Sequence, residues 1–321
     1  MIKCGVIGAG NIGFRCELDD KRIKPASHCG AYIFHDESTL VFVCDKQKNF
    51  LSEAQQYFDD SVQCSDQISD MPECDIVSVA VQPQYHLEVI EKIIDKTKVI
   101  LCEKPIADNI DSAEKIIEIC ENKKVQLIIN NHRRFDPLVI DLKKSITESV
   151  FGKINSVSCY YTNGLFTNGS HMIDLMIYFF GLPKSYVVLE SNKTCPKSDF
   201  NANVFFDYGT FTVSIQCLEL FSMNVFDFRI FADMGILNLT QFSKRLEMMK
   251  KRKCTMFNGY FEPDYNVSQV LESNTSNMMN SISHAIDCFK GKDISKSTGR
   301  DAIESIRIIH DIQNKLKVIN V

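Results

Sequence analysis

Short apolar runs, separated by segments with helical periodicity, fill the first 131 residues and constrain the fold of this chain more than any other feature. The runs are Val6-Ile7, Leu40 to Cys44, Ile76 to Val81, Val99 to Cys102 and Val125 to Ile129. Strands that are apolar throughout and alternate with helices form a parallel sheet covered on both faces. The pattern therefore predicts a doubly wound α/β domain. Its helices are predicted at Phe50 to Phe58, Tyr85 to Ile94 and Asp111 to Asn122, the last capped by Asp108 and Asp111.

Beyond Phe135 the strand candidates are longer and follow one another with few helices between them. Successive strands of this kind predict an antiparallel sheet. The candidates are Ile154 to Thr162, Tyr186 to Glu190, Asn203 to Phe206, Thr210 to Leu220, Asp227 to Phe231 and Ile236 to Thr240. Two helices, Asn274 to Phe289 and Arg300 to Leu316, end the chain. We therefore expect two domains, residues 1–131 and residues 132–321.

A glycine-rich turn, Gly8-Ala9-Gly10-Asn11-Ile12-Gly13, follows the first strand candidate, Ile2 to Ile7. Such a turn carries a strand sharply into a helix, keeps side chains away from a pyrophosphate and points the helix N-terminus at its negative charge. Its place directly after a strand favours dinucleotide binding. The alternative is a tight strand-to-helix turn without a ligand.

The second strand candidate ends at Asp45. An aspartate there accepts hydrogen bonds from the two ribose hydroxyls of an adenosine and repels a 2′-phosphate, so we expect NAD. Lys46 leaves NADP open as the second choice. Asp45 lies further from Gly13 than the usual roughly 20 residues. Phe14 to Ser27 looks like an insertion before a helix at His28 to Phe34, and it either covers the cofactor or substrate mouth or has no role.

Charge and cysteine content exclude several classes of protein. A net charge of −5 and a pI near 5.8 argue against a nucleic-acid partner, because phosphate neutralisation needs clustered Lys and Arg. The 13 cysteines are an odd number without a C-x-x-C spacing, so we predict no metal site and no disulfide framework. The protein is expected in the reducing cytoplasm. Met172 to Leu182 is too short to cross a bilayer, and no membrane partner is predicted.

Lys104 lies in the tripeptide Glu103-Lys104-Pro105, directly after the apolar run that ends at Cys102. A lysine that leaves a buried strand just ahead of a proline sits at a sheet edge. An ammonium group can be held there near a substrate.

These motifs, together with others in the same order, make the chain resemble the Gfo/Idh/MocA oxidoreductases over essentially its whole length. The motifs are the glycine turn, Asp45, Val81 to His86, Glu103 to Pro105, His132 to Pro137 and Gly169 to Asp174. The resemblance implies a Rossmann domain followed by an α+β domain with a large open sheet, which binds substrate and forms oligomers. The active site would lie where the nicotinamide meets this second domain.

The resemblance also implies roles for single residues. Glu103 and Lys104 flank the nicotinamide ribose and ring, Lys104 contacts the substrate hydroxyl, and Pro105 commonly follows a strained or cis bond. Val81, Pro83 and His86 match the segment that touches the cofactor, although His86 could instead be a packed structural histidine. The implied cofactor-binding residues are Gly8, Gly10, Asn11, Ile12, Gly13, Asp45, Val81, Pro83, His86, Glu103 and Lys104. The implied substrate-binding residues are Lys104, Arg134, Asn168, His171 and Asp174.

Oxidation of a secondary alcohol needs a hydride acceptor, a group that takes the hydroxyl proton and donors that stabilise the developing carbonyl. His171, at the start of an apolar helix, is predicted to take the proton, and Lys104 to polarise the oxygen. The family usually carries an aspartate four residues before this histidine, where this chain has Thr167. Threonine lacks the negative charge that raises the basicity of a histidine. Asp174 has either a substrate contact or a structural hydrogen bond.

The leading hypothesis is an NAD(P)-dependent dehydrogenase or reductase that acts on a secondary hydroxyl of a sugar, cyclitol or nucleotide sugar. One alternative is an NAD-using glycosidase, which would not release NADH. Another is a cofactor- or sugar-sensing regulator without turnover, which Thr167 favours and the pair Lys104 and His171 opposes. An open sheet generally buries its uncovered face against a partner, so we expect a homodimer or homotetramer.

Overall fold

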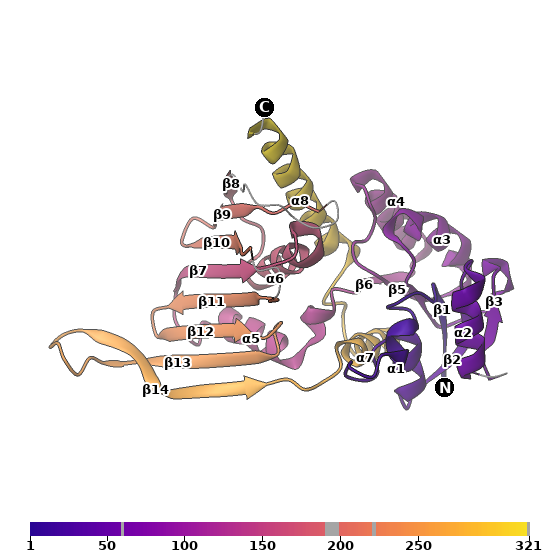
Figure 1. The fold of residues 1–321 in the computed structure, drawn as a ribbon, viewed down its shortest axis with the longest axis horizontal. Helices are drawn as coiled ribbons and strands as arrows, with labels where there is room; N and C mark the ends of the chain where they lie inside the picture. Colours follow the sequence, from indigo (N-terminus) through magenta and orange to yellow (C-terminus); the bar gives the residue numbers. More distant parts are fainter. Residues whose placement is uncertain (59–60, 190–198, 220–222, 320–321) are drawn as a thin grey trace. The chain divides into compact units, whose positions relative to one another are not determined.

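The computed structural model describes residues 1–58, 61–189, 199–219 and 223–319. The chain forms two compact units (Figure 1), Met1–Phe135 with Thr275–Ile306 and Asp136–Asn274 with Arg307–Val321. Residues 275–306 were predicted to belong to the second domain. They pack with the first unit because helix α7 (Asn277–Phe289) places Met278 and Ile282 in the same apolar cluster as Val6 of the first strand.

The first unit is built on a parallel sheet with the strand order β3-β2-β1-β4-β5-β6. Its strands are β1 (Ile2–Ile7), β2 (Ser38–Cys44), β3 (Gln63–Ser65), β4 (Ile76–Val79), β5 (Val99–Cys102) and β6 (Gln126–Ile129). This order is that of a Rossmann sheet and confirms the predicted doubly wound class. In such sheets ligands lie beyond the carboxyl ends of the strands, where the order reverses between β1 and β4.

Helices cover both faces of this sheet (Figure 1). They are α1 (His28–Phe34), α2 (Lys48–Phe58), α3 (His86–Ile93) and α4 (Ile110–Lys123). Because successive strand residues point to opposite faces, Val6 joins the cluster that contains α7, whereas Ile7 joins the cluster that contains α3 and α4. The apolar runs of the sequence are continuous for this reason.

The N-terminus of α4 corrects a prediction. Asn109, and neither Asp108 nor Asp111, caps this helix, since its side chain accepts a hydrogen bond from the Ser112 N–H. Asp108 accepts a hydrogen bond from the Asn109 amide instead. Asp111 lies in the first turn of the helix, where its negative charge is favourable.

The second unit contains an eight-stranded sheet with the order β14-β13-β12-β11-β7-β10-β9-β8. Its strands are β7 (Ile154–Tyr161), β8 (Ser185–Leu189), β9 (Asn203–Asp207), β10 (Thr212–Cys217), β11 (Phe226–Ala232), β12 (Gly235–Thr240), β13 (Arg245–Lys253) and β14 (Phe261–Glu272). The pair β7 and β10 is parallel, and the other pairs are antiparallel. The mostly antiparallel sheet was predicted correctly. The predicted strand ends Glu190 and Leu220 lie outside the described residues.

One face of this second sheet is covered by helices α5 (Pro137–Thr147) and α6 (Ser170–Phe180) and by part of α8 (Gly299–Ile319). Met172 and Ile312 pack there against Phe228. Other side chains of the sheet, such as Val187 and Phe205, are exposed. No helix among the described residues is long and apolar enough to span a bilayer. The cysteines in the described part of the chain are free thiols.

Candidate functional site

The glycine turn is fixed by packing at two of its three glycines. A Cβ on Gly8, which has a φ of +106°, would lie 2.7 Å from the backbone of Ala80. A Cβ on Gly13 would lie 1.8 Å from the carbonyl oxygen of Gly8. A Cβ on Gly10 would meet no atom within 4 Å. The described residues thus give no steric reason for glycine at position 10, whereas a pyrophosphate lying against the backbone does, so the turn fits a dinucleotide.

The helix that follows the glycine turn is interrupted and then resumes. The carbonyl oxygens of Ile12 and Gly13 accept hydrogen bonds from the backbone N–H groups of His28 and Cys29, each at 3.0 Å. Helix α1 therefore continues directly from the first helical turn. The residues between, Phe14 to Ser27, leave and return as a loop, which confirms the predicted insertion. That this loop covers a ligand stays a prediction.

Glu17 holds the inserted loop in place from inside. Its buried carboxylate accepts hydrogen bonds from the Ala26 N–H at 2.9 Å, the Ser27 N–H at 3.0 Å and the Ser27 hydroxyl at 2.8 Å. The Ser27 oxygen in turn accepts a hydrogen bond from Gly30 and caps α1. A Cβ on Gly30 would lie 2.1 Å from the carboxylate of Glu17, so glycine makes room for it. The loop is thus tied to the start of α1.

Asp45 follows β2 and lies against the glycine turn. One of its carboxylate oxygens accepts a hydrogen bond from the Ala9 N–H at 2.7 Å, and the other accepts one from the Gln47 N–H at 2.8 Å. Each carboxylate oxygen has a second lone pair, so Asp45 retains capacity to accept hydrogen bonds from ribose hydroxyls. The ammonium of the neighbouring Lys46 lies 3.8 Å from a carboxylate oxygen of Glu88.

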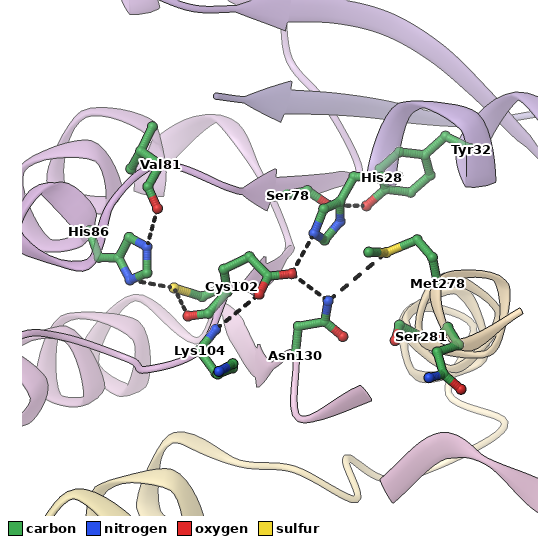
Figure 2. A network of polar contacts seen from close by, with 12 residues as sticks. His28, Tyr32, Ser78, Val81, His86, Cys102, Lys104, Asn130, Met278 and Ser281 are labelled. Atoms are coloured by element: carbon green, nitrogen blue, oxygen red, sulfur yellow. Dashed lines mark hydrogen bonds and ion pairs between the residues drawn. The ribbon is translucent and has the colours of Figure 1, made fainter. Parts of the chain in front are cut away.

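Glu103 follows β5, and its carboxylate, in a side chain that is 14% exposed, joins a polar network with His28 and Asn130, which Figure 2 labels. His28 Nε2 lies 2.9 Å from Glu103 Oε1, and the Asn130 amide donates to the same oxygen at 2.6 Å. Burial raises the pKa of Glu103, but the hydrogen bonds from His28 and Asn130 outweigh it and hold that pKa below its usual value. The carboxylate is therefore ionised at neutral pH, and His28 Nε2 donates. His28 Nδ1 and Asn130 Oδ1 are buried without a hydrogen-bond partner among the described residues.

Lys104 is half-buried next to this network, and its backbone N–H lies 3.3 Å from Glu103 Oε2. The bond between Lys104 and Pro105 is cis, as the resemblance implied. Figure 2 draws Lys104 together with this network. The backbone of Lys104 is thus held by the end of β5 and by the Glu103 carboxylate. That the ammonium group polarises a substrate oxygen stays a prediction.

Val81 and Pro83 are half-buried after β4, whereas His86 is fully buried. One ring nitrogen of His86 lies 3.1 Å from the carbonyl oxygen of Ile106. The other lies 3.0 Å from that of Val81 (Figure 2). Burial lowers the pKa of His86. These contacts give His86 a structural role, since it ties the segment after β4 to the segment after β5. A direct contact of His86 with a cofactor stays a prediction.

In the second unit, His171 and Asp174 lie buried in the first turns of α6. A π-helical turn (Leu165–Gly169) that contains Thr167 and Asn168 precedes them. The Thr167 hydroxyl donates to Asp199 at 2.8 Å, and the Thr167 N–H donates to the same carboxylate at 2.9 Å. The predicted residues Asn168, His171 and Asp174 are thus brought to one helix start.

Arg134, predicted to bind substrate, is buried in the first unit and is 2% exposed. Its guanidinium donates to the Lys296 carbonyl oxygen at 3.0 Å and lies 3.6 Å from Asp301 Oδ2. These contacts join the segment after β6 to Lys296, which precedes α8, and to the first turn of α8. A contact of Arg134 with substrate stays a prediction.

Taken by itself, the first unit gathers most predicted cofactor residues at one edge of its sheet. The glycine turn, Asp45, Val81 and Glu103 follow the carboxyl ends of β1, β2, β4 and β5, and Gly8 N–H donates to the Cys44 carbonyl. Sequence reasoning missed His28, Asn130 and Asp199. Asn130 follows β6 at the same edge, and its position directly after an apolar run could have identified it from the sequence. His28 could not be identified in this way, because the insertion separates it from the glycine turn. Asp199 has no sequence signal.

Comparisons with known proteins agree with this geometry. Residues 2–131 match the family described as "Oxidoreductase family, NAD-binding Rossmann fold". The chain is 24% identical over 157 residues to inositol 2-dehydrogenase of Rhizobium meliloti, which covers 49% of this chain and 44% of that protein. It is 25% identical over 164 residues to the scyllo-inositol 2-dehydrogenase (NADP(+)) IolW of Bacillus subtilis, covering 45% of this chain and 46% of that one. The matches thus span less than half the length of these relatives.

Solved structures resemble the chain over almost its whole length. The WlbA dehydrogenase from Bordetella pertussis, solved in complex with NADH and UDP-GlcNAcA, has a TM-score of 0.75 and 17% sequence identity. The likeness covers 98% of this chain and 96% of that one. At this identity it shows that the two proteins share a fold.

Proposed function

This chain belongs, through residues 2–131, to the Gfo/Idh/MocA oxidoreductases with an NAD(P)-binding Rossmann fold, and from this premise we propose that it is a nicotinamide-dependent dehydrogenase or reductase. The reaction moves a hydride between the cofactor and a secondary hydroxyl. The substrate is a sugar, a cyclitol or a nucleotide sugar. The inositol dehydrogenases among the relatives support this substrate class, since each is named for oxidation of a polyol.

The single observation that carries the proposal is the combination of Gly10 with the Glu103 network at one edge of the first sheet. Gly10 leaves space for a pyrophosphate next to the backbone, and Glu103 is an ionised carboxylate fixed by His28 and Asn130. The Glu103 side chain is only 14% exposed, and removing a carboxylate from water to this extent is costly unless it is hydrogen-bonded. Glu103 is held at the sheet edge where dinucleotides bind, and this position favours a contact with the nicotinamide ribose and ring.

Two side chains have the proposed chemical roles. When bound, the nicotinamide supplies the hydride acceptor. His171 takes the proton of the substrate hydroxyl, for which the usual imidazole pKa near neutrality is suited. Lys104 donates a hydrogen bond to the substrate oxygen and stabilises the negative charge that develops on it. Asn168 and Asp174, on the same helix start as His171, contact the other hydroxyls.

The preferred cofactor in this proposal is NAD. Asp45 lies beside the glycine turn, where its carboxylate accepts hydrogen bonds from the ribose hydroxyls and repels a 2′-phosphate. Lys46, which would favour a phosphate, lies near Glu88, and this carboxylate offsets its charge. NADP is the second choice.

The proposal is tested by a screen of polyols and nucleotide sugars with NAD and with NADP, in which the absorbance of free reduced nicotinamide is followed. Turnover with NAD is expected. Lys104→Ala and His171→Ala should each lower kcat at least about 100-fold, the usual scale for one acid-base or electrostatic group, with little change in the Kd of NAD. Unchanged turnover in both variants would remove their catalytic assignment. Turnover without release of NADH would favour the glycosidase alternative.

A further inference from the structure

The hairpin of β13 and β14 extends beyond the other strands of the second sheet (Figure 1). β13 pairs with β12 only as far as Lys250, and its last three residues pair with β14 alone. One further backbone hydrogen bond, from Lys251 to the carbonyl oxygen of Met234 at 2.9 Å, ties the hairpin to the turn before β12. We call residues 251–263 the arm. Beyond this bond the arm is a two-stranded ribbon without a third strand among the described residues, and such a ribbon is only marginally stable in water.

The tip of the arm exposes large apolar side chains. Met256 is 77% exposed, Phe257 61%, Tyr260 70% and Phe261 57%. The rings of Phe257 and Tyr260 lie edge to face, with their centroids 6.3 Å apart. Single exposed apolar residues are ordinary, but a group of them within one short segment marks an interaction site. Aromatic residues and methionine are also the types that protein interfaces favour.

The arm differs in charge from the rest of the chain. It contains three cations, Lys251, Arg252 and Lys253, and one carboxylate, Glu262, so its net charge is +2. The whole chain has a net charge of −5, which leaves −7 for the remainder. Arg252 pairs with Glu262 at 2.9 Å, so the excess positive charge lies on the two exposed lysines. A second copy of the chain therefore offers the arm a surface of opposite net charge.

We propose that the arm binds a second copy of this chain and that each copy receives the arm of the other. Reciprocal exchange of this kind gives a closed pair with two-fold symmetry. Covering the exposed part of the three aromatic rings buries roughly 300 to 450 Å² per arm. Two arms and the surfaces that they meet then amount to roughly 1,200 to 1,800 Å², which is the usual size of a stable interface.

A membrane with anionic lipids is the competing partner, because lysines beside exposed aromatic rings also suit a lipid surface. Charge favours the second copy. An anionic surface attracts the arm but repels the remainder of the chain, whereas the acidic remainder of a second copy attracts the arm. Recognition of anionic lipids by charge also uses clusters of about four to eight cations, and the arm has three.

The test is sedimentation velocity of the full chain over a range of protein concentrations. The wild type should dimerise at micromolar concentration. Phe257→Asp combined with Tyr260→Asp should raise the dimer dissociation constant at least about 30-fold, the factor that one buried aromatic anchor is worth. Ile294→Asp, at an exposed apolar position of the first unit, is the matched control and should leave the constant unchanged. An unaltered constant in the arm variant would overturn the proposal and would place the contact elsewhere.

The contribution of charge is measured separately with Lys251→Glu combined with Lys253→Glu. This variant should raise the dissociation constant about three- to tenfold at low ionic strength, and the difference from the wild type should narrow at about 0.5 M salt. If the aromatic variant has no cooperative melting transition, the lysine variant decides, because both lysines are exposed. Equal constants for the lysine variant and the wild type at low ionic strength would then contradict the proposal.

The wild type alone also tests the choice of partner. A protein that stays monomeric at the highest concentration in the cell would overturn the proposal. If that monomer co-sediments with vesicles of phosphatidylcholine and phosphatidylserine, and Phe257→Asp combined with Tyr260→Asp abolishes this binding, the arm serves a lipid surface instead.

Discussion

Glu103 receives hydrogen bonds from two buried side chains, His28 at the start of α1 and Asn130 after β6. Neither residue belongs to the motifs that carry the family resemblance. They nevertheless hold Glu103 in one orientation, because a carboxylate that is only 14% exposed keeps its charge at low cost only when its oxygens are hydrogen-bonded. At the scale of single residues, the candidate site therefore extends beyond its motifs.

His28→Leu should weaken NAD binding about tenfold and destabilise the protein by about 1 to 3 kcal/mol, because a buried charged group loses one hydrogen bond. NAD titration calorimetry and urea denaturation measure the two effects. His284→Gln is a matched control, since His284 is also a buried histidine of the first unit but contacts Asp293 and Lys296. If His28→Leu binds NAD as tightly as the wild type, the network does not serve the cofactor.

Sequence reasoning identified candidate residues at strand ends, whose contacts with a cofactor stay predictions, and missed the residues that approach them only through folding. Asp45 and Glu103 end apolar runs, and the edge of a parallel sheet places them together. The partner of Thr167 could not be found in this way, because Asp199 is 32 residues away along the chain. His28 was not identified from the sequence, because the insertion separates it from Gly13.

At the scale of elements, the inserted loop of residues 14–27 depends on Glu17. Glu17→Ala should destabilise the first unit by about 2 to 3 kcal/mol, because it leaves buried donors of Ala26 and Ser27 unpaired. It should also speed proteolytic cleavage within the loop. Asp20→Ala, at an exposed position of the same loop, is the control and should change neither quantity. Equal protease resistance of both variants would show that the carboxylate does not anchor the loop.

Some elements with regular apolar patterns, such as β8 and α2, were predicted to within one or two residues. Others differ more, since α7 begins three residues after its predicted start and α8 ends three residues after its predicted end. The basic run Lys250 to Lys253 was interpreted as a solvated hairpin end, and it lies at the end of β13, but the strands β13 and β14 themselves were not predicted. The first of these strands contains the basic run, and the second contains Pro263, so neither shows the alternation of a half-buried strand. These strands form because β12 offers an edge for pairing, which is information that a local pattern does not contain.

At the scale of the whole molecule, the return of the chain to the first unit was the feature that sequence reasoning could not supply. Along the chain, residues 275–306 follow the mostly antiparallel sheet of the second unit and yet belong to the first unit. The predicted homodimer or homotetramer stays a prediction. Exposed Val187, Leu189 and Phe205, on neighbouring strands β8 and β9, are apolar positions that a second copy would cover.

The returning segment should make stability depend on pH. Burial, together with Lys296, lowers the pKa of His284 to about 4, although Asp293 opposes the shift. An unfolded histidine has a pKa of about 6.5, so below that pH the unfolded state binds a proton that the folded state does not. Lowering the pH from 7.5 to 5 should therefore cost about 2 kcal/mol of unfolding free energy from this residue alone. Urea denaturation at both values measures it.

His284→Gln should reduce this loss between pH 7.5 and 5. Buried His86, whose pKa is also lowered, acts in the same direction and accounts for part of what remains. A pH dependence identical in the variant and the wild type would mean that His284 is protonated in the folded protein at pH 5.

The most direct test of the account is calorimetric titration of NAD into Gly10→Ala. A Cβ at this position meets no atom within 4 Å, so the melting temperature should equal that of the wild type. The same Cβ should lower NAD affinity about tenfold or more, because it occupies the space proposed for the pyrophosphate. Gly13→Ala, where a Cβ would lie 1.8 Å from the Gly8 carbonyl oxygen, should instead lose stability. Wild-type NAD affinity in a folded Gly10→Ala protein would contradict the proposed dinucleotide site.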